Sequence, residues 1–221
     1  MGEAGMAKQM VRLAALLKLG LCLALGLATP AAAAGDACRI AVLGDSLTSA
    51  YGLDVAQGFP AELERQLDAA GYRCTVLDAG VPGDTSAGGL ARLDWMLGDR
   101  PSHVIVELGG NDALRGLPPE ELERNLDAIL ARLQAQGIHV LLAGMLAPPN
   151  LGEDYGRAFA AVYQRVAAGH GVPLYRFFLD GVAGDPELIQ PDGIHPTAEG
   201  QRIIADRLWS YLRPLLDRPT H

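Results

Sequence analysis

The chain alternates short apolar runs with amphipathic segments, and this alternation restricts the folds open to it. The apolar runs are rich in Val, Ile and Leu and span residues 39–44, 74–80, 103–110, 139–145 and 172–177. Runs of this kind are typical of strands buried on both faces, as in a parallel sheet. The sequence therefore predicts a strand at each of them.

Between these runs, apolar residues recur at helical spacing. The clearest case is 119–137, where Leu122 and Leu126 lie on one stripe, Pro119 stands near the start and Gly137 at the end. Proline is favoured in the first helical turn and glycine just past the last one. The other predicted helices span 59–71, 86–98, 155–171 and 197–217, of which 86–98 has the weakest pattern.

Strands that alternate with helices predict one α/β domain, with a doubly wound parallel sheet covered on both faces. With 221 residues, 49% hydrophobic and 20% charged, the chain has enough apolar material for one substantial core. We expect Pro214 to break or end the last helix, and 146–156 to form a long surface loop. A net charge of −8 without a basic cluster beyond the N-terminus argues against a nucleic-acid partner.

The N-terminus has the pattern of a targeting segment. Lys8, Arg12 and Lys18 precede the apolar run 19–28, and small residues follow it. That run has the length of a signal-peptide core and is short for a bilayer span. The pattern predicts a bacterial protein that is exported, either to the periplasm or out of the cell.

Cleavage after Ala33 or Ala34 would remove a signal peptide, residues 1–34, and leave a single domain, 35–221. The mature chain would then keep no stable membrane anchor. The alternative is an uncleaved anchor that begins near Val11.

Two cysteines remain beyond the targeting segment. Cys38 and Cys74 each lie six residues before a glycine, Gly44 and Gly80, that ends a predicted strand. If these strands are parallel neighbours, the two side chains come within bridging range, and exported proteins favour disulfides. The alternative is a pair of buried thiols.

Polar residues gather where the predicted strands end. Asp45 and Ser46 follow the first strand, Gly83 follows the second, and Asn111 follows the third. In open α/β sheets, ligands bind outside these carboxyl ends. Each cluster alone also has a structural explanation, because Ser46 suits a helix N-cap and the glycines before Asn111 suit a turn.

One histidine is placed to meet Ser46. His195 follows the last predicted strand, whereas His103 and His139 precede strands and belong to the opposite edge. Asp192 lies three residues before His195, in a turn that brings both side chains to one side. An aspartate that orients a histidine, and a histidine that accepts the serine proton, form the arrangement that a hydroxyl nucleophile requires.

Acyl transfer also requires donors aimed at the oxyanion. By position, these are the Ser46 N–H at a helix N-terminus, the Gly83 N–H and the Asn111 side-chain amide. Leu47 and Leu114 are candidate contacts for the acyl group.

These motifs together resemble the GDSL, or SGNH, hydrolases. The matching blocks are GDSL at 44–47, Gly83 within PGDTS, GGND at 109–112 and DGIHP at 192–196. The resemblance implies a flavodoxin-like three-layer sandwich, with a five-stranded parallel sheet in the order 2-1-3-4-5. It also implies a nucleophile, two oxyanion donors and a histidine–aspartate pair at the positions already named.

Two longer stretches, GDTSAGGLARL and VELGGNDALRG, are similar to the periplasmic thioesterase and lysophospholipase branch, and APPNLGEDYGRAF is similar to its arylesterases. The resemblance implies a serine esterase that acts on small acyl esters or thioesters without a metal or an organic cofactor. We expect a monomer, although the sequence itself contains no signal of oligomeric state. One alternative is a carbohydrate acetylesterase of the same fold. A second is a metal-dependent phosphoesterase built on Asp45, Asp112, Asp192 and His195, and a third is a binding protein without activity.

Overall fold

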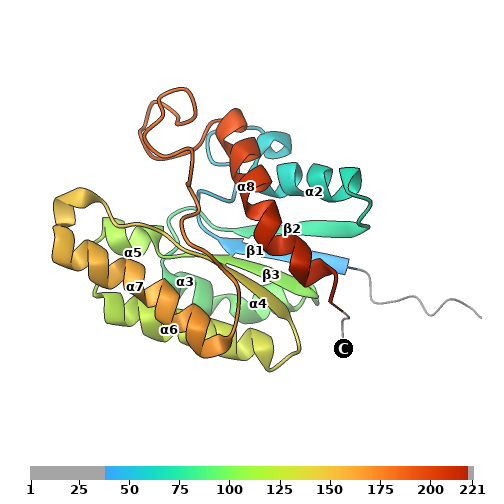
Figure 1. Cartoon of the computed structure of the whole chain (residues 1–221), viewed down its shortest axis with the longest axis horizontal. Helices are drawn as coiled ribbons and strands as arrows, with labels where there is room; N and C mark the ends of the chain where they lie inside the picture. The colour runs from blue at the N-terminus through green and yellow to red at the C-terminus, as the bar shows by residue number, and fades with distance from the viewer. Residues whose placement is uncertain (1–37, 219–221) are drawn as a thin grey trace, which may run out of the picture. The chain divides into compact units, whose positions relative to one another are not determined.

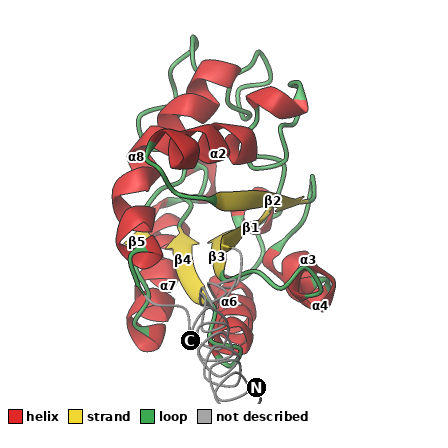
Figure 2. Ribbon diagram, turned by 90° about the vertical axis from the view of Figure 1, so that its right-hand side faces the viewer, coloured by secondary structure: helices red, strands yellow, loops and turns green. Residues whose placement is uncertain are grey.

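A computed structural model describes residues 38–218 and shows a parallel sheet between two layers of helices (Figures 1 and 2). The sheet has five strands in the order β2-β1-β3-β4-β5. Their bounds are Cys38–Gly44 (β1), Cys74–Gly80 (β2), His103–Glu107 (β3), His139–Ala143 (β4) and Leu174–Tyr175 (β5). The predicted fold class and strand order are confirmed.

One helical layer consists of α2 and α8, and the other contains α3, α4, α6 and α7 (Figure 2). The helices span Phe59–Ala69 (α2), Ser86–Ala91 (α3), Leu93–Leu97 (α4), Gly110–Leu114 (α5), Pro119–Gln134 (α6), Glu153–His170 (α7) and Ala198–Leu216 (α8), with short 3₁₀ turns at Val55–Gln57 (η1) and Pro149–Leu151 (η2). None of the helices within residues 38–218 has both the length and the apolar character needed to cross a bilayer.

The core lies where the central strands meet both helical layers. Ile40 and Leu43 of β1 and Ile105 of β3 are fully buried, as the continuous apolar runs predict. On α6, Leu122 and Leu126 are buried against the sheet side, which confirms the helical stripe.

Some predicted boundaries are wrong. The third strand stops at Glu107, because the backbone turns through Gly109, at a φ of 117°, into α5. Helix α7 begins at Glu153, so the loop before it is shorter than predicted. Acidic residues in a first turn interact favourably with the helix dipole, and Glu153 and Asp154 occupy that turn.

Two helices differ from the prediction in where they are interrupted. The predicted helix 86–98 is interrupted at Arg92, which separates α3 from α4. In contrast, α8 continues through Pro214 to Leu216. Pro214 lies in the last turn, so its missing N–H costs one hydrogen bond, while Leu212 and Leu215 on either side stay buried.

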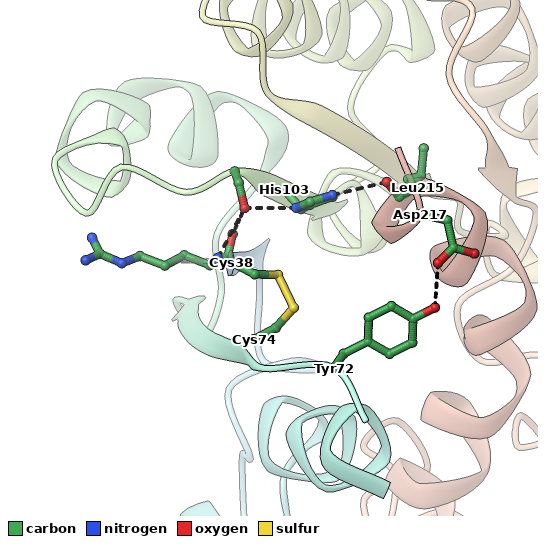
Figure 3. Close-up of a disulfide and its surroundings, with 8 residues drawn as sticks. Cys38, Tyr72, Cys74, His103, Leu215 and Asp217 are labelled. Carbon is green, nitrogen blue, oxygen red and sulfur yellow. Dashed lines mark hydrogen bonds between the residues drawn. A yellow bond between two sulfur atoms is a disulfide. The ribbon is translucent and has the colours of Figure 1, made fainter. Parts of the chain in front are cut away.

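Cys38 and Cys74 are directly opposite each other in the β1–β2 register and are joined by a disulfide, with their Cα atoms 4.5 Å apart (Figure 3). Nearby, the Tyr72 hydroxyl donates to Asp217, and the His103 ring lies 3.3 Å from the Leu215 carbonyl oxygen. These contacts fasten the C-terminal end of α8 at the amino ends of the strands.

Candidate active site

Four segments meet at the carboxyl ends of the strands. Ser46 follows β1, Gly83 follows β2, Asn111 lies in α5 after β3, and His195 lies in the loop before α8. All four line one cavity of about 510 Å³. The structure therefore brings together residues that the sequence places far apart.

Ser46, His195 and Asp192 form a hydrogen-bonded chain. His195 Nε2 lies 2.8 Å from Ser46 Oγ, and His195 Nδ1 lies 2.6 Å from Asp192 Oδ2. The predicted relationship of these three side chains is thus present in space.

The hydrogen bonds to Asp192 determine which nitrogen of His195 carries the ring proton. Its Oδ1 accepts the backbone N–H groups of His195 and Ile194, at 3.0 and 2.9 Å. These bonds, together with the His195 side chain, lower the pKa of Asp192 to about 2. The carboxylate is ionised and can only accept, so Nδ1 carries the ring proton and Nε2 is free to accept the Ser46 hydroxyl.

Tyr51 and Gln190 also contact His195. The Tyr51 ring lies against the imidazole, with ring centroids 4.3 Å apart. The Gln190 N–H donates to the His195 carbonyl oxygen, and the Gln190 side-chain amide donates to the carbonyl oxygens of Tyr51 and Pro196. Gln190 therefore links the histidine loop to the loop that contains Tyr51.

Ser46 is not at a helix N-terminus, which corrects the prediction. Residues 46–52 form consecutive turns, and Ala50 adopts a φ of 54°, which an α-helix does not allow. Asp45 shapes this turn, because its Oδ1 accepts the Leu47 N–H at 2.9 Å. The side chain of Asp45, and not that of Ser46, therefore closes this turn.

The turn also needs glycine at the end of β1. A Cβ at Gly44 would lie 2.3 Å from Oγ1 of Thr48, which is fully buried. Thr48 can approach this strand end so closely only because Gly44 has no side chain.

The Asn111 amide is oriented by Asp45. Asn111 Nδ2 donates one hydrogen to Asp45 Oδ2 at 2.9 Å, which leaves its second hydrogen for another acceptor. The Gly83 segment is fastened to the same helix, because Arg115 at the end of α5 donates to the Gly83 carbonyl oxygen at 2.8 Å. Gly83 has a φ of 84°, a conformation that favours glycine.

A second contact joins these two segments. Ser86, at the start of α3, donates its N–H and its hydroxyl to the buried Asp112 carboxylate, next to Asn111. Asn125 of α6 donates in turn to the Ser86 hydroxyl oxygen. The α5 segment is therefore held by charged and neutral hydrogen bonds on its buried side.

Asp45 faces a second carboxyl group, Glu107, at the end of β3. Glu107 is completely buried, and its Oε1 has no hydrogen-bond partner. Burial, followed by the charge of Asp45, raises the pKa of Glu107 well above its usual value, and burial raises the pKa of Asp45 to about 6. We infer that Glu107 is protonated at neutral pH.

The two residues predicted to contact an acyl group, Leu47 and Leu114, both line the cavity. Leu47 is 4% exposed and Leu114 is 54% exposed, so only Leu114 stands at the opening. Leu146 and Ile194 add further exposed apolar surface to the same lining.

Glu107, Tyr51 and Gln190 are not predicted from the sequence pattern. A single glutamate in the run HVIVELGG is a readable signal of a buried acid. The contact between Gln190 and Tyr51 has no local signal, because it joins residues 139 positions apart.

The acidic residues considered as metal ligands make separate contacts. Asp45 binds Leu47 and Asn111, Asp112 binds Ser86, and Asp192 binds His195. Between Cys38 and Arg218, no three His, Cys, Asp or Glu side chains lie close enough together to hold a metal ion.

The chain matches known hydrolases over most of its length. A model of the GDSL-like lipase/acylhydrolase family matches residues 42–203. Esterase TesA of Pseudomonas aeruginosa is 46% identical over 196 residues, which cover 88% of this chain and 96% of that protein. Thioesterase 1/protease 1/lysophospholipase L1 of Escherichia coli (strain K12) is 40% identical over 187 residues, 84% of this chain and 88% of that protein.

A similar fold is present in the crystal structure of the psychrotrophic esterase EstA from Pseudoalteromonas sp., inhibited by monoethylphosphonate. The TM-score is 0.77 at 34% identity, and the match covers 81% of this chain and 99% of EstA.

Proposed function

Because the chain belongs to the GDSL-like lipase/acylhydrolase family and is an ester-hydrolysing enzyme, we propose that Ser46, His195 and Asp192 are its catalytic triad. The observation that carries this proposal is the unbroken chain from Ser46 Oγ through both nitrogens of His195 to Asp192. Such a chain is how a weak hydroxyl nucleophile is activated.

In the first step, Ser46 Oγ attacks the carbonyl carbon of the ester while His195 Nε2 takes the serine proton. The carbonyl oxygen becomes an oxyanion, which the N–H groups of Ser46 and Gly83 and the free amide hydrogen of Asn111 stabilise. The imidazolium is stabilised by Asp192 and by the face of the Tyr51 ring. The tetrahedral intermediate then expels the alcohol or thiol, which leaves with the proton from His195.

In the second step, His195 accepts a proton from water as the water oxygen attacks the acyl carbon of the acyl-enzyme. Collapse of this second intermediate breaks the bond to Ser46 Oγ, which recovers its proton from His195, and the carboxylic acid is released. The cycle consumes one water and needs no metal or organic cofactor.

The cavity favours substrates with an apolar acyl group. Leu47, Leu114, Leu146 and Ile194 line it together with Ser46 and His195. We propose carboxylic esters and thioesters as substrates, in keeping with the relatives that are named esterase, thioesterase and lysophospholipase. The apolar lining fits an acyl chain better than it fits the sugar of a carbohydrate acetylesterase.

We also propose that the enzyme is exported. The proposed signal peptide, residues 1–34, lies outside the described part of the chain and is supported by its sequence pattern alone. The Cys38–Cys74 disulfide is consistent with an oxidising compartment.

The test of the triad is Ser46→Ala, compared with Ser49→Ala three residues further on. Ser46→Ala should abolish hydrolysis of p-nitrophenyl esters and covalent labelling by a fluorophosphonate, which reacts with activated serines. Ser49→Ala should retain both, and both variants should keep the wild-type circular dichroism spectrum. Labelling or turnover that survives in Ser46→Ala would exclude Ser46 as the nucleophile.

A further inference from the structure

Arg92 occupies the interruption between α3 and α4, and its side chain reaches back to the ends of two strands. Its guanidinium donates to the Gly44 carbonyl oxygen at 2.9 Å and to the Ala79 carbonyl oxygen at 2.6 Å. Gly44 lies two residues before Ser46, and Ala79 lies four residues before Gly83. One side chain therefore binds the strand ends from which both loops emerge.

The same guanidinium holds a third segment. Arg92 Nε donates to Asp84 Oδ2 at 2.5 Å, and Asp84 directly follows Gly83. The two side chains are 16% and 19% exposed, so this ion pair is shielded from water and from salt. It is thus a stronger restraint than an ion pair on the open surface.

The ion pair between Arg92 and Asp84 also has an electrostatic effect on the site. A free carboxylate one residue from Gly83 would repel an oxyanion that forms near the Gly83 N–H. Arg92 neutralises that carboxylate where it lies. Loss of Arg92 would therefore loosen the loop and also add an uncompensated negative charge beside it.

Arginine suits this position for a geometric reason. Its planar guanidinium carries donors that point in several fixed directions, and here they reach two backbone carbonyls and one carboxylate. A lysine ammonium is a point charge at the end of a flexible chain and does not reproduce this fork.

We propose that Arg92 is a positioning residue that sets the spacing between the Ser46 loop and the Gly83 loop. It does not belong to the cavity lining and acts through the two loops that do. This inference rests on the proposed function, in which Ser46 is the nucleophile and Gly83 an oxyanion donor.

The test compares Arg92→Met and Arg92→Lys with Arg165→Met. Arg165 pairs with Glu123 through two hydrogen bonds on the surface between α7 and α6, so its loss removes an ion pair of similar type away from the site. For each variant, kcat per active site, KM for p-nitrophenyl butyrate and the rate of inactivation by a fluorophosphonate are measured. Titration with the fluorophosphonate counts the active sites, so a misfolded fraction does not lower kcat.

Arg92→Met should lower kcat on the order of 10²-fold, the loss expected for a displaced oxyanion donor, and leave KM within about threefold. Phosphonylation should slow by the same factor. Arg92→Lys, which keeps the charge opposite Asp84, should be on the order of tenfold slower than the wild type. Arg165→Met should match the wild type.

A further variant separates charge from geometry. The double variant Arg92→Met/Asp84→Asn lacks both the contacts of Arg92 with the Gly44 and Ala79 carbonyls and the unpaired carboxylate. If the missing carbonyl contacts lower kcat, the kcat of this double variant should stay well below that of the wild type. Wild-type kcat per active site in Arg92→Met would overturn the inference. If that variant does not fold, wild-type kcat in Arg92→Lys would overturn it equally.

The proposed function fails by a different result. If the wild-type enzyme is not labelled at Ser46, the triad itself is wrong. If the wild type is labelled and Arg92→Met reacts as fast, only the role of Arg92 is wrong.

Discussion

The Asp45 backbone N–H donates to Glu107 Oε2 at 3.4 Å, which places two acidic residues side by side next to Ser46. One of them, Glu107, sits at the end of β3 with a pKa raised well above 4.5, first by burial and then by the charge of Asp45. The enzyme therefore keeps a neutral acid beside its proposed nucleophile at a cost in stability that depends on pH.

Replacing Glu107 with glutamine should remove part of that pH dependence. Below about pH 4.5 the glutamate is protonated in both the folded and the unfolded chain. As the pH rises, the unfolded chain loses this proton while the folded chain keeps it, so wild-type stability falls. Glutamine has no proton to lose, and Glu107→Gln should gain stability relative to the wild type with each step in pH above 4.5.

Urea unfolding at pH 4.5, 6.0 and 7.5 measures this difference. Glu120→Gln, on the exposed face of α6, serves as the control. Asp45, with a pKa near 6, also lowers stability as the pH rises. It does so in both the wild type and Glu107→Gln, so its effect largely cancels in the comparison. A stability difference that stays constant across these pH values would contradict a neutral Glu107.

Gly83→Ala should lower turnover because of the backbone conformation at that position. A φ of 84° costs an L-residue about 1 kcal/mol or more, and the loop can relieve this strain only by moving the Gly83 N–H. Gly71 has a φ of 83° with open space around it and no contact with the cavity, so Gly71→Ala carries a similar strain elsewhere.

Thermal unfolding and kcat should separate the two glycine variants. Both should lose stability, but only Gly83→Ala should lose turnover, by roughly 10- to 100-fold. Equal kcat in the two variants would contradict the proposal that Gly83 is an oxyanion donor.

Leu114→Ser should raise KM selectively for esters with long acyl chains. Leu114 stands at the opening of the cavity, and an octanoyl chain that covers it would bury about half of a leucine side chain. The lost contact corresponds to roughly 1 kcal/mol, or about a fivefold increase in KM for p-nitrophenyl octanoate.

The acetyl ester should show no such increase, because it does not reach Leu114. Trp95→Ser is the matched control, since Trp95 is an exposed apolar residue on α4 that does not line the cavity. An increase that is the same for acetyl and octanoyl esters would show that Leu114 does not contact the acyl chain.

Removing the disulfide should affect stability and not turnover. Cys38 and Cys74 are 36 positions apart and lie at the amino ends of the strands, while the proposed triad lies at the carboxyl ends. A cross-link that closes a loop of this size stabilises by about 4 kcal/mol, which corresponds to roughly 10 °C in Tm for a domain of this size.

The double variant Cys38→Ala/Cys74→Ala should therefore melt earlier than the wild type and keep its kcat per active site at 25 °C. Treatment of the wild type with dithiothreitol should give the same shift, and the variant should not respond to it. A fall in kcat without a fall in Tm would mean that the two edges of the sheet are coupled.

The positions of the strands along the chain and the edge of the sheet that holds the site motifs could be predicted from local patterns, whereas the strand order came from the family resemblance. Apolar runs such as 39–44 predict buried strands, and polar residues just beyond them must lie at one edge of a parallel sheet. Ser46, Gly83, Asn111 and His195 meet there for this reason.

The rest depends on contacts between distant segments, which no local pattern contains. Ser46 in sequence resembles a helix cap, but the fold places Ala50 at a φ of 54° and so forms a turn. Pro214 resembles a helix breaker, but its buried neighbours hold the last turn. Arg92 resembles an ordinary surface arginine of a helix, and only the structure shows its three acceptors.

Ser46 and His195 touch although 149 positions separate them in the chain. Almost the whole domain must be synthesised, and α8 must pack beside α2, before the proposed nucleophile meets its base. Closing a loop of this length is among the slow events of folding. A nascent or truncated chain that lacks the last helix would therefore be inactive, and the appearance of activity during refolding would report the docking of the His195 loop against Ser46.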